Sequence, residues 1–236
     1  MNKKILPQEV LKLIACVTML IDHFGYGIVF HLPVPNVVDL YYICRIIGRL
    51  AFPIYCFLLV EGMRHTHQPG KYIFRLGIGI LLSELPFDAL VKGGIDWSYQ
   101  SVMVTLALGA VMLRCMQKTE EKWMKVLLVL PFAILAELAK SDYGGWGIVM
   151  IAVFALFEQI PMQMVAVLLV NAAVESATIS VFGVNVSVQL FATLAMIPIA
   201  LYSGRKLTHS KAIQWGFYLF YPVHFLILWI IRAFCC

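Results

Sequence analysis

The stretch Thr18-Met19-Leu20-Ile21-Asp22-His23-Phe24-Gly25-Tyr26 decides the interpretation of this chain, because it places a carboxylate and an imidazole inside an apolar run. The run extends from Val10 to Phe30 and is long enough to span a bilayer. Ionisable groups at membrane depth are costly, so Asp22 and His23 invite a functional explanation. The alternative is that the pair is a structural polar contact between helices.

The composition indicates the class of protein. Apolar residues make up 61% of the chain, charged residues 13%, and the mean hydropathy is +0.87. A soluble domain is usually about half apolar and a quarter charged. We therefore predict an all-α integral membrane protein with a single polytopic domain over residues 1–236. The net charge of +5 is interpreted as loop charge that sets orientation, and not as a sign of nucleic-acid binding.

The six cysteines show no metal-type spacing, and no metal is predicted. Most of them lie in apolar runs and are interpreted as small core residues. Cys235 and Cys236 end the sequence, where lipidation stays open on a weak signal. Lys3 and Lys4 precede an apolar segment, as in a signal peptide, but no cleavage site follows, so we expect a retained first helix.

Apolar runs recur along the whole chain and predict a bundle of about nine transmembrane helices. Gly144-Gly145 and Pro161 are the breaks that separate the two least regular runs from their neighbours. The predicted helices are 9–31, 41–62, 71–92, 99–116, 123–140, 143–158, 161–182, 185–203 and 213–234.

Lysine and arginine gather in every second loop of this layout, whereas the alternate loops hold only Lys92 and Lys140. The positive-inside rule then places the N-terminus in the cytoplasm and, with nine helices, the C-terminus outside. The basic loops are marked by Lys3, Lys4 and Lys12, by Arg64, Lys71 and Arg75, by Arg114, Lys118, Lys122 and Lys125, and by Arg205, Lys206 and Lys211.

This orientation gives each ionisable residue a depth. At 1.5 Å per residue, Asp22 lies roughly 18 Å from the inner edge, just past mid-membrane. Acids, two arginines and two histidines then gather between the midplane and the outer face, and they must line a shared interior or a water-filled cavity. They are Asp22, His23, Arg45, Arg49, Glu84, Asp88, Glu137, Glu175 and His224, with Asn171 and Tyr221 beside them.

Arg45 and Arg49 share one helix face at i, i+4, and the most plausible partners for both are Asp22, Glu84 and Asp88. A set of ion pairs that only holds helices together is the alternative to a functional site. Prolines at 53, 86 and 222 fall among these residues, and each frees a carbonyl one turn back and bends its helix.

Five motifs follow one another along nearly the whole chain. They are Thr18-Met19-Leu20-Ile21-Asp22-His23, Arg45-Ile46-Ile47-Gly48-Arg49-Leu50-Ala51-Phe52-Pro53, Ser83-Glu84-Leu85-Pro86-Phe87-Asp88, Asp142-Tyr143-Gly144-Gly145 and Phe217-Tyr218-Leu219-Phe220-Tyr221-Pro222-Val223-His224, and the second continues through Leu58-Leu59-Val60-Glu61-Gly62. In this order the motifs resemble those of the TraX family. One departure is Gln100-Ser101, where Gln-Asn is expected, and it puts a polar contact at Ser101 in doubt.

The resemblance implies a multi-pass acetyltransferase in the bacterial cytoplasmic membrane that takes acetyl groups from cytoplasmic acetyl-CoA. The acceptor expected from the family is a pilin N-terminal amine, and wider relatives modify sugars on the far side of the membrane. A donor from the basic inner face and an acceptor near the outer half would meet at the ionisable cluster.

The predicted reaction is acyl transfer from a thioester to an amine or hydroxyl, which needs a base and donors for the developing oxyanion. His23 is the first candidate base and His224 the second. Asp22 points roughly 100° away from His23 around the helix, so Glu84 or Asp88 is the expected orienting acid. The predicted substrate-binding residues are Arg45, Arg49, Tyr221, Glu175 and Gln100, and those for the phosphates of coenzyme A are Arg64, Lys71, Arg75 and Lys12.

The rival class is a proton-coupled transporter that uses the same Asp, Glu and His cluster as a relay. The absence of a detectable internal repeat counts against it, since many transporters carry one. A non-catalytic scaffold leaves the cluster without an explanation. The residues alone do not choose between a protein amine, a glycan and a lipid-linked sugar as the acceptor.

Overall fold

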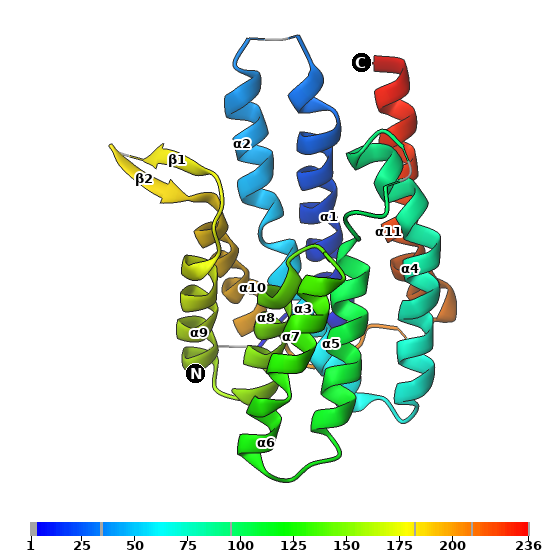
Figure 1. Ribbon diagram of the computed structural model, residues 1–236, viewed down its shortest axis with the longest axis vertical. Helices are drawn as coiled ribbons and strands as arrows, with labels where there is room; N and C mark the ends of the chain where they lie inside the picture. The colour runs from blue at the N-terminus through cyan, green and yellow to red at the C-terminus, as the bar shows by residue number, and fades with distance from the viewer. Residues whose placement is uncertain (1–3, 34, 95, 182, 209, 236) are drawn as a thin grey trace.

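The computed structural model describes residues 4–33, 35–94, 96–181, 183–208 and 210–235. Its helices run up and down along one axis, and a two-stranded hairpin stands at the edge (Figure 1). The elements are α1 (Gln8–Gly27), η1 (Val29–His31), α2 (Val37–Gly48), α3 (Ala51–His65), α4 (Pro69–Val91), α5 (Val102–Met116), α6 (Lys122–Leu127), α7 (Val129–Leu138), α8 (Gly144–Leu156), α9 (Ile160–Ala173), β1 (Thr178–Val181), β2 (Val184–Ser187), η2 (Val188–Ala195), α10 (Met196–Ala200) and α11 (Lys211–Cys235).

Three helical stretches among the described residues are long and apolar enough to cross a membrane, by length and composition: Gln8–His31, Val37–His65 and Lys211–Phe234. α4, with 23 residues, is also long but carries four charged residues, and the remaining helices are shorter. The 13 residues of α8 rise only about 20 Å, less than the roughly 30 Å of a hydrocarbon core. The helical, membrane-type architecture agrees with the prediction, whereas nine spans and their orientation stay predictions.

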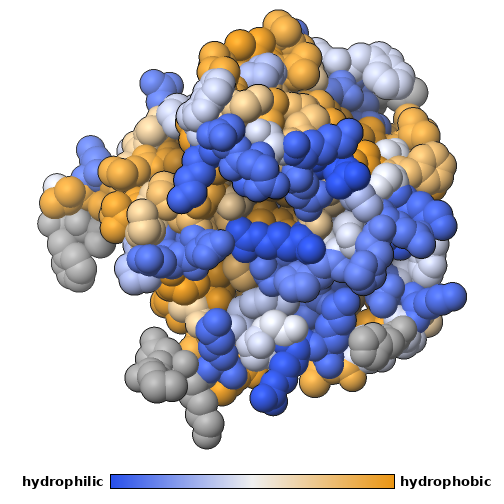
Figure 2. All heavy atoms as spheres, turned by 90° about the horizontal axis from the view of Figure 1, so that it is seen from below, coloured by the Kyte–Doolittle hydropathy of each residue, from blue (hydrophilic) through white to orange (hydrophobic). Residues whose placement is uncertain are grey.

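The outer surface is apolar along the sides of the bundle. Leu81 on α4, Leu138 on α7 and Leu169 on α9 are 78%, 75% and 64% exposed. Figure 2 shows the lower end of Figure 1, where hydrophilic side chains gather over the centre while orange, apolar residues lie towards the edge. An apolar belt of this kind is what a helical bundle presents to lipid.

The core lies where α1, α3, α5, α8 and α11 meet. Leu11, Ile54, Met112, Ile148 and Phe225 are fully buried there and belong to one hydrophobic cluster. Because α3 carries a nearly continuous run of buried residues, it is the central helix around which the others pack.

The predicted helix 41–62 is interrupted, and the interruption positions the site. α2 ends at Gly48 and α3 begins at Ala51. Pro53 has no N–H to donate to the carbonyl of Arg49, so the helical ladder is broken at this point. In the same way the predicted helix 123–140 is divided into α6 and α7.

The boundary between the predicted helices 161–182 and 185–203 is wrong. α9 ends at Ala173, and β1 and β2 pair as an antiparallel hairpin in the register Thr178↔Ser187 and Val181↔Val184. Alternating β-branched and polar residues favour strands, and Gly183 supplies the positive φ of 80° that the turn requires. The lipidation considered at Cys235 and Cys236 stays a prediction, because Cys236 lies outside the described residues.

Candidate functional site

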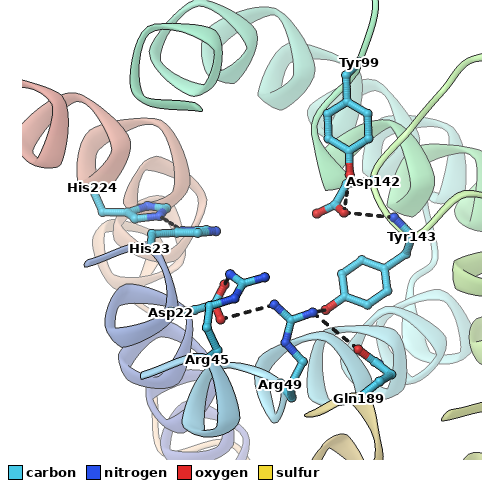
Figure 3. A network of polar contacts seen from close by, with 9 residues as sticks. All are labelled: Asp22, His23, Arg45, Arg49, Tyr99, Asp142, Tyr143, Gln189 and His224. Atoms are coloured by element: carbon cyan, nitrogen blue, oxygen red, sulfur yellow. Dashed lines mark hydrogen bonds and ion pairs between the residues drawn. The ribbon is translucent and has the colours of Figure 1, made fainter. Parts of the chain in front are cut away.

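A cavity of about 320 Å³ opens between α1, α2, α3, the α4–α5 loop and the turn between α7 and α8. We call it the polar cavity, because ionisable and phenolic side chains meet on its walls (Figure 3). These side chains belong to Asp22, His23, Tyr26, Arg45, Arg49, Tyr55, Lys92, Tyr99, Asp142 and Tyr143.

Asp22 binds both predicted arginines. Its Oδ2 accepts a hydrogen bond from Arg45 Nη1 at 2.6 Å, and its Oδ1 accepts one from Arg49 Nη2 at 3.3 Å. The carboxylate is 11% exposed and the two guanidinium side chains are 24% and 14% exposed. The predicted pairing of the arginines with an acid among Asp22, Glu84 and Asp88 is thus confirmed, and Asp22 is that acid.

Gly48 makes this close arrangement of α1 and α2 possible. A Cβ built at Gly48 would collide with the carboxyl group of Asp22. About one turn away along the same contact, Gly25 of α1 packs directly on the side chain of Cys44 of α2. The two helices therefore approach through small residues, as membrane helices commonly do.

Arg49 also connects the cavity to the far side of the bundle. Its Nη1 donates to the hydroxyl of Tyr143 and to Oε1 of Gln189, each at 3.3 Å. The amide of Gln189 in turn donates to Oδ1 of Asn171 at 2.9 Å. Since Gln189 and Asn171 are 2% and 0% exposed, this chain of contacts is shielded from the surroundings.

The two candidate histidines contact each other although 201 residues separate them. His23 Nδ1 lies 2.7 Å from His224 Nε2, and His224 Nδ1 lies 2.8 Å from the carbonyl of Phe220. A carbonyl only accepts, so His224 Nδ1 carries hydrogen and its Nε2, when neutral, accepts from His23 Nδ1. His23 therefore keeps a free lone pair on Nε2, and Figure 3 shows the outer end of its ring directed into the cavity.

Asp142 and Tyr99 form the opposite wall. The Tyr99 hydroxyl donates to Oδ1 of Asp142 at 2.7 Å, and the same oxygen accepts the backbone N–H of Tyr143 at 3.0 Å. Tyr143 adopts φ 63°, a left-handed conformation that is rare for a bulky residue, and its ring stacks on Phe52 at 3.7 Å. Backbone conformations of this kind concentrate at functional sites.

The polar cavity holds charges of both signs. Arg45 and Arg49 face Asp22 and Asp142, and Lys92 pairs with Asp96 at 3.6 Å, so each cation has a carboxylate near it. In the described part of the chain, no group of three or more His, Cys, Asp or Glu side chains is arranged to hold a metal ion. The chemistry that these walls offer is proton transfer by imidazole and stabilisation of negative charge by guanidinium.

The structure corrects the roles expected for Glu84 and Asp88. Glu84 accepts hydrogen bonds from the backbone and hydroxyl of Ser101, and Asp88 accepts the backbone N–H of Asp96 at 3.0 Å. Neither carboxylate lines the cavity or orients His23, because His224 occupies that position. The doubted polar contact at Ser101 is present, with Glu84 as its partner at 2.6 Å.

Three predicted substrate-binding residues lie elsewhere. Glu175 is exposed and follows the end of α9, so it is not on a helix face with Asn171. The Gln100 amide donates to the carbonyl of Trp97 at 3.0 Å, and its backbone pairs with the α7–α8 turn. Tyr221 is buried, lies edge-on to His224 at 5.6 Å and lines a second cavity below the polar one.

The four residues expected to bind coenzyme A phosphates do not form one cluster. Arg64 donates to the carbonyls of Phe154 and Ala155, each at 3.1 Å, and so caps α8. Lys71 is exposed, and the Arg75 guanidinium lies over the rings of Tyr72 and Tyr218. Lys12 alone lines the second cavity, with its ammonium 5.3 Å from the centre of the Phe217 ring.

Sequence reasoning assigned no site role to five residues that complete the site. Asp142 and Tyr143 stood within a recognised motif, which was the available signal for them. Lys92 was interpreted only as a loop charge. The five residues are Lys92, Tyr99, Asp142, Tyr143 and Gln189.

Comparison with known proteins identifies a family and a relative. Residues 7–232 match the TraX family, described as "TraX protein". The chain is 27% identical over 231 residues to a probable fimbrial assembly protein, FimC of serogroup H1, from Dichelobacter nodosus, and the match covers 92% of each chain. No solved structure matches the chain.

Proposed function

We propose that this chain, which belongs to the TraX family, is a membrane acetyltransferase that moves an acetyl group from cytoplasmic acetyl-CoA to an amine or hydroxyl acceptor. The observation that carries the proposal is the histidine pair, in which the contact between His23 Nδ1 and His224 Nε2 leaves His23 Nε2 free on the cavity wall. A free imidazole nitrogen in a cavity is the group that general-base catalysis requires.

The residues of the polar cavity divide the steps of such a transfer. The amine nitrogen or hydroxyl oxygen of the acceptor attacks the thioester carbonyl, and His23 Nε2 removes the proton from that atom. The new C–N or C–O bond forms, the C–S bond breaks, and His23 returns the proton to the departing thiolate. Arg45 and Arg49 carry one positive charge more than Asp22 neutralises, and this surplus stabilises the oxyanion of the tetrahedral intermediate.

A protein N-terminal amine is the acceptor that we favour. The relative named as a probable fimbrial assembly protein covers almost the whole chain. Asp142 and Tyr99 stand on the wall opposite the arginines, where a carboxylate attracts a cationic amine before its deprotonation. A glycan hydroxyl is the other acceptor class, and the acceptor panel below separates the two.

The proposed setting is the bacterial cytoplasmic membrane, with the donor supplied from the cytoplasmic face. The lower end of the bundle is hydrophilic over its centre (Figure 2), and the basic α3–α4 and α5–α6 loops lie at that end (Figure 1). The donor is an anionic carrier, so a basic face is suited to its arrival. The acceptor would reach the polar cavity from the opposite face.

The test is turnover of labelled acetyl-CoA by purified protein with three acceptors: a peptide with a free N-terminus, the same peptide with a blocked N-terminus, and a sugar. We expect labelling of the peptide with the free N-terminus, and a transfer rate that is about 10²–10⁴-fold lower in His23→Ala. His67→Ala is the matched control, because His67 is exposed in the α3–α4 loop. Normal turnover by monodisperse His23→Ala protein would exclude His23 as the base, and proton movement without any turnover would indicate a transporter.

A further inference from the structure

A second cavity of about 170 Å³ lies below the polar one, and we call it the lower cavity. It is lined at the lower helix ends by Gln8 and Lys12 of α1 and by Gln214 and Phe217 of α11. Towards the bundle centre it reaches Cys16. These helix ends lie on the side of the basic loops, whereas the α4–α5 loop, which brings Lys92 to the polar cavity, lies at the other end of the bundle (Figure 1).

The two cavities follow the same faces of the same helices. Along α1, positions 8, 12, 16 and 19 line the lower cavity, and positions 19, 22, 23 and 26 line the polar one. Along α3, positions 51, 52 and 55 line the polar cavity, and positions 55, 58, 59 and 62 line the lower one. Spacings of three and four residues keep one helix face in line, so the two cavities follow one another along the same faces of α1 and α3.

Four residues line both cavities and therefore stand between them. Tyr55 is the largest, and its hydroxyl lies 3.2 Å from the Cys16 thiol, which holds the ring across the channel. Met19 is the flexible, unbranched member, and it belongs to α1. The four residues are Met19, Tyr55, Val102 and Leu106.

We propose that the two cavities are one passage and that Tyr55 with Met19 forms a movable partition, through which the acyl end of a thioester donor reaches His23. The cargo in this inference rests on the proposed function, whereas the partition itself does not. From Lys12 to His23 the helix rises about 17 Å. A thioester on a long flexible arm spans that distance with its anionic carrier near Lys12 and its carbonyl at the imidazole.

Breaking a single weak contact is enough to open such a partition. A hydroxyl–thiol hydrogen bond is weaker than one between oxygen and nitrogen, because sulfur is a poor donor and acceptor. Rotation of the Tyr55 side chain away from Cys16 and a change of Met19 rotamer would join the cavities without moving a helix. Side-chain changes of this kind are fast compared with enzymatic turnover.

The experiment uses Cys16 as a reporter, because it lines only the lower cavity. The other five cysteines are replaced by serine, and vesicles of both orientations are treated with an anionic, impermeant methanethiosulfonate. Labelling is expected only from the side of the Lys118–Lys125 loop. Tyr55→Ala should make Cys16 reactive from both sides, whereas Leu59→Ala, which enlarges only the lower cavity, should leave labelling one-sided.

Several outcomes would overturn the partition: labelling of the parent from both sides, labelling from neither side, or one-sided labelling in monodisperse Tyr55→Ala protein. If Tyr55→Ala does not fold, Met19→Ala removes the facing member and answers the same question. Failure of the cargo assignment is separable. Acetyl-CoA should slow labelling of Cys16. Turnover of acetyl-CoA without such protection would overturn the passage and leave the acetyltransferase proposal standing. A partition that opens as expected, without any turnover, would refute the acetyltransferase proposal alone.

Discussion

His23 Nδ1 and His224 Nε2 lie 2.7 Å apart, and this contact joins α1 to α11 at the wall of the polar cavity. The carbonyl of Phe220 accepts from the other nitrogen of His224 and so determines the tautomer of both rings. In the proposed reaction, His224 is therefore a positioning residue for His23. Its carbonyl partner lies in the turn of α11 that precedes Pro222 and His224.

Replacement of His224 tests this positioning role. His224→Gln keeps an acceptor for His23 Nδ1–H, whereas His224→Phe keeps a ring and removes the acceptor. We expect acetyl transfer to fall in both variants and to fall further in His224→Phe. Without an acceptor for Nδ1–H, the His23 ring is free to turn its protonated nitrogen towards the cavity, where that nitrogen cannot act as a base. The measurement is the transfer rate at saturating donor, with folded yield as the control. Equal rates in the two variants would contradict a role through hydrogen bonding.

The Asp22–arginine cluster predicts a combined loss of stability and activity. Asp22→Ala leaves two partly buried guanidinium groups without their carboxylate, whereas Arg49→Ala leaves Asp22 with Arg45 still at 2.6 Å. Breaking a buried pair in soluble proteins costs about 3–5 kcal/mol. We expect folded yield to fall in the order wild type, Arg49→Ala, Asp22→Ala, measured by size exclusion in detergent. Arg49→Ala protein with full yield and full activity would show that this ion pair is dispensable.

Two glycine substitutions test the close approach of α1 and α2. Gly48→Ala adds a Cβ that collides with Asp22, and overpacking of this kind typically costs about 1–3 kcal/mol. Gly77→Ala on α4 is the matched control, because its Cβ meets nothing within 4 Å. Thermal unfolding should show a lower melting temperature only for Gly48→Ala. An equal fall in the melting temperature of Gly77→Ala would mean that glycine itself is needed in these helices.

The predicted orientation is tested with single cysteines in a background that lacks the native ones. A cysteine at Lys118 and one at Lys71 should react with an impermeant reagent only in inside-out vesicles. A cysteine at Gly94 should react only in intact cells, because the α4–α5 loop lies at the other end of the bundle (Figure 1). Reaction of the Lys118 position in intact cells would reverse the orientation and the donor side inferred from it.

The basic residues near the lower end should separate into donor-binding and structural groups. Lys12→Ala should raise the KM for acetyl-CoA and leave the thermal stability nearly unchanged, because Lys12 lines the lower cavity. Arg64→Ala should lower the stability, because Arg64 caps α8 and pairs with Glu61 at 3.5 Å. An unchanged KM in Lys12→Ala would place the donor phosphates elsewhere.

Much of this protein follows from its amino-acid sequence. Apolar runs indicate the helical bundle, because backbone polar groups in lipid must be satisfied within each segment. The cost of buried charge predicts that Arg45 and Arg49 bind an acid, and Asp22 confirms it. Pro53 predicts the break that separates α2 from α3.

Only the tertiary structure decided which groups meet. Asp22, Glu84 and Asp88 were equivalent partners by depth, and helix packing selected Asp22, because Gly48 lets α2 approach that carboxylate. The contact of His23 with His224 spans 201 residues, and no local periodicity encodes such a distance. Asp142 enters the site from a turn in which Tyr143 has a left-handed backbone conformation and stacks on Phe52, a residue of a distant helix. Depth and helix face follow from a period of 3.6 residues, whereas the rotation of one helix against another follows from side-chain packing over the whole bundle.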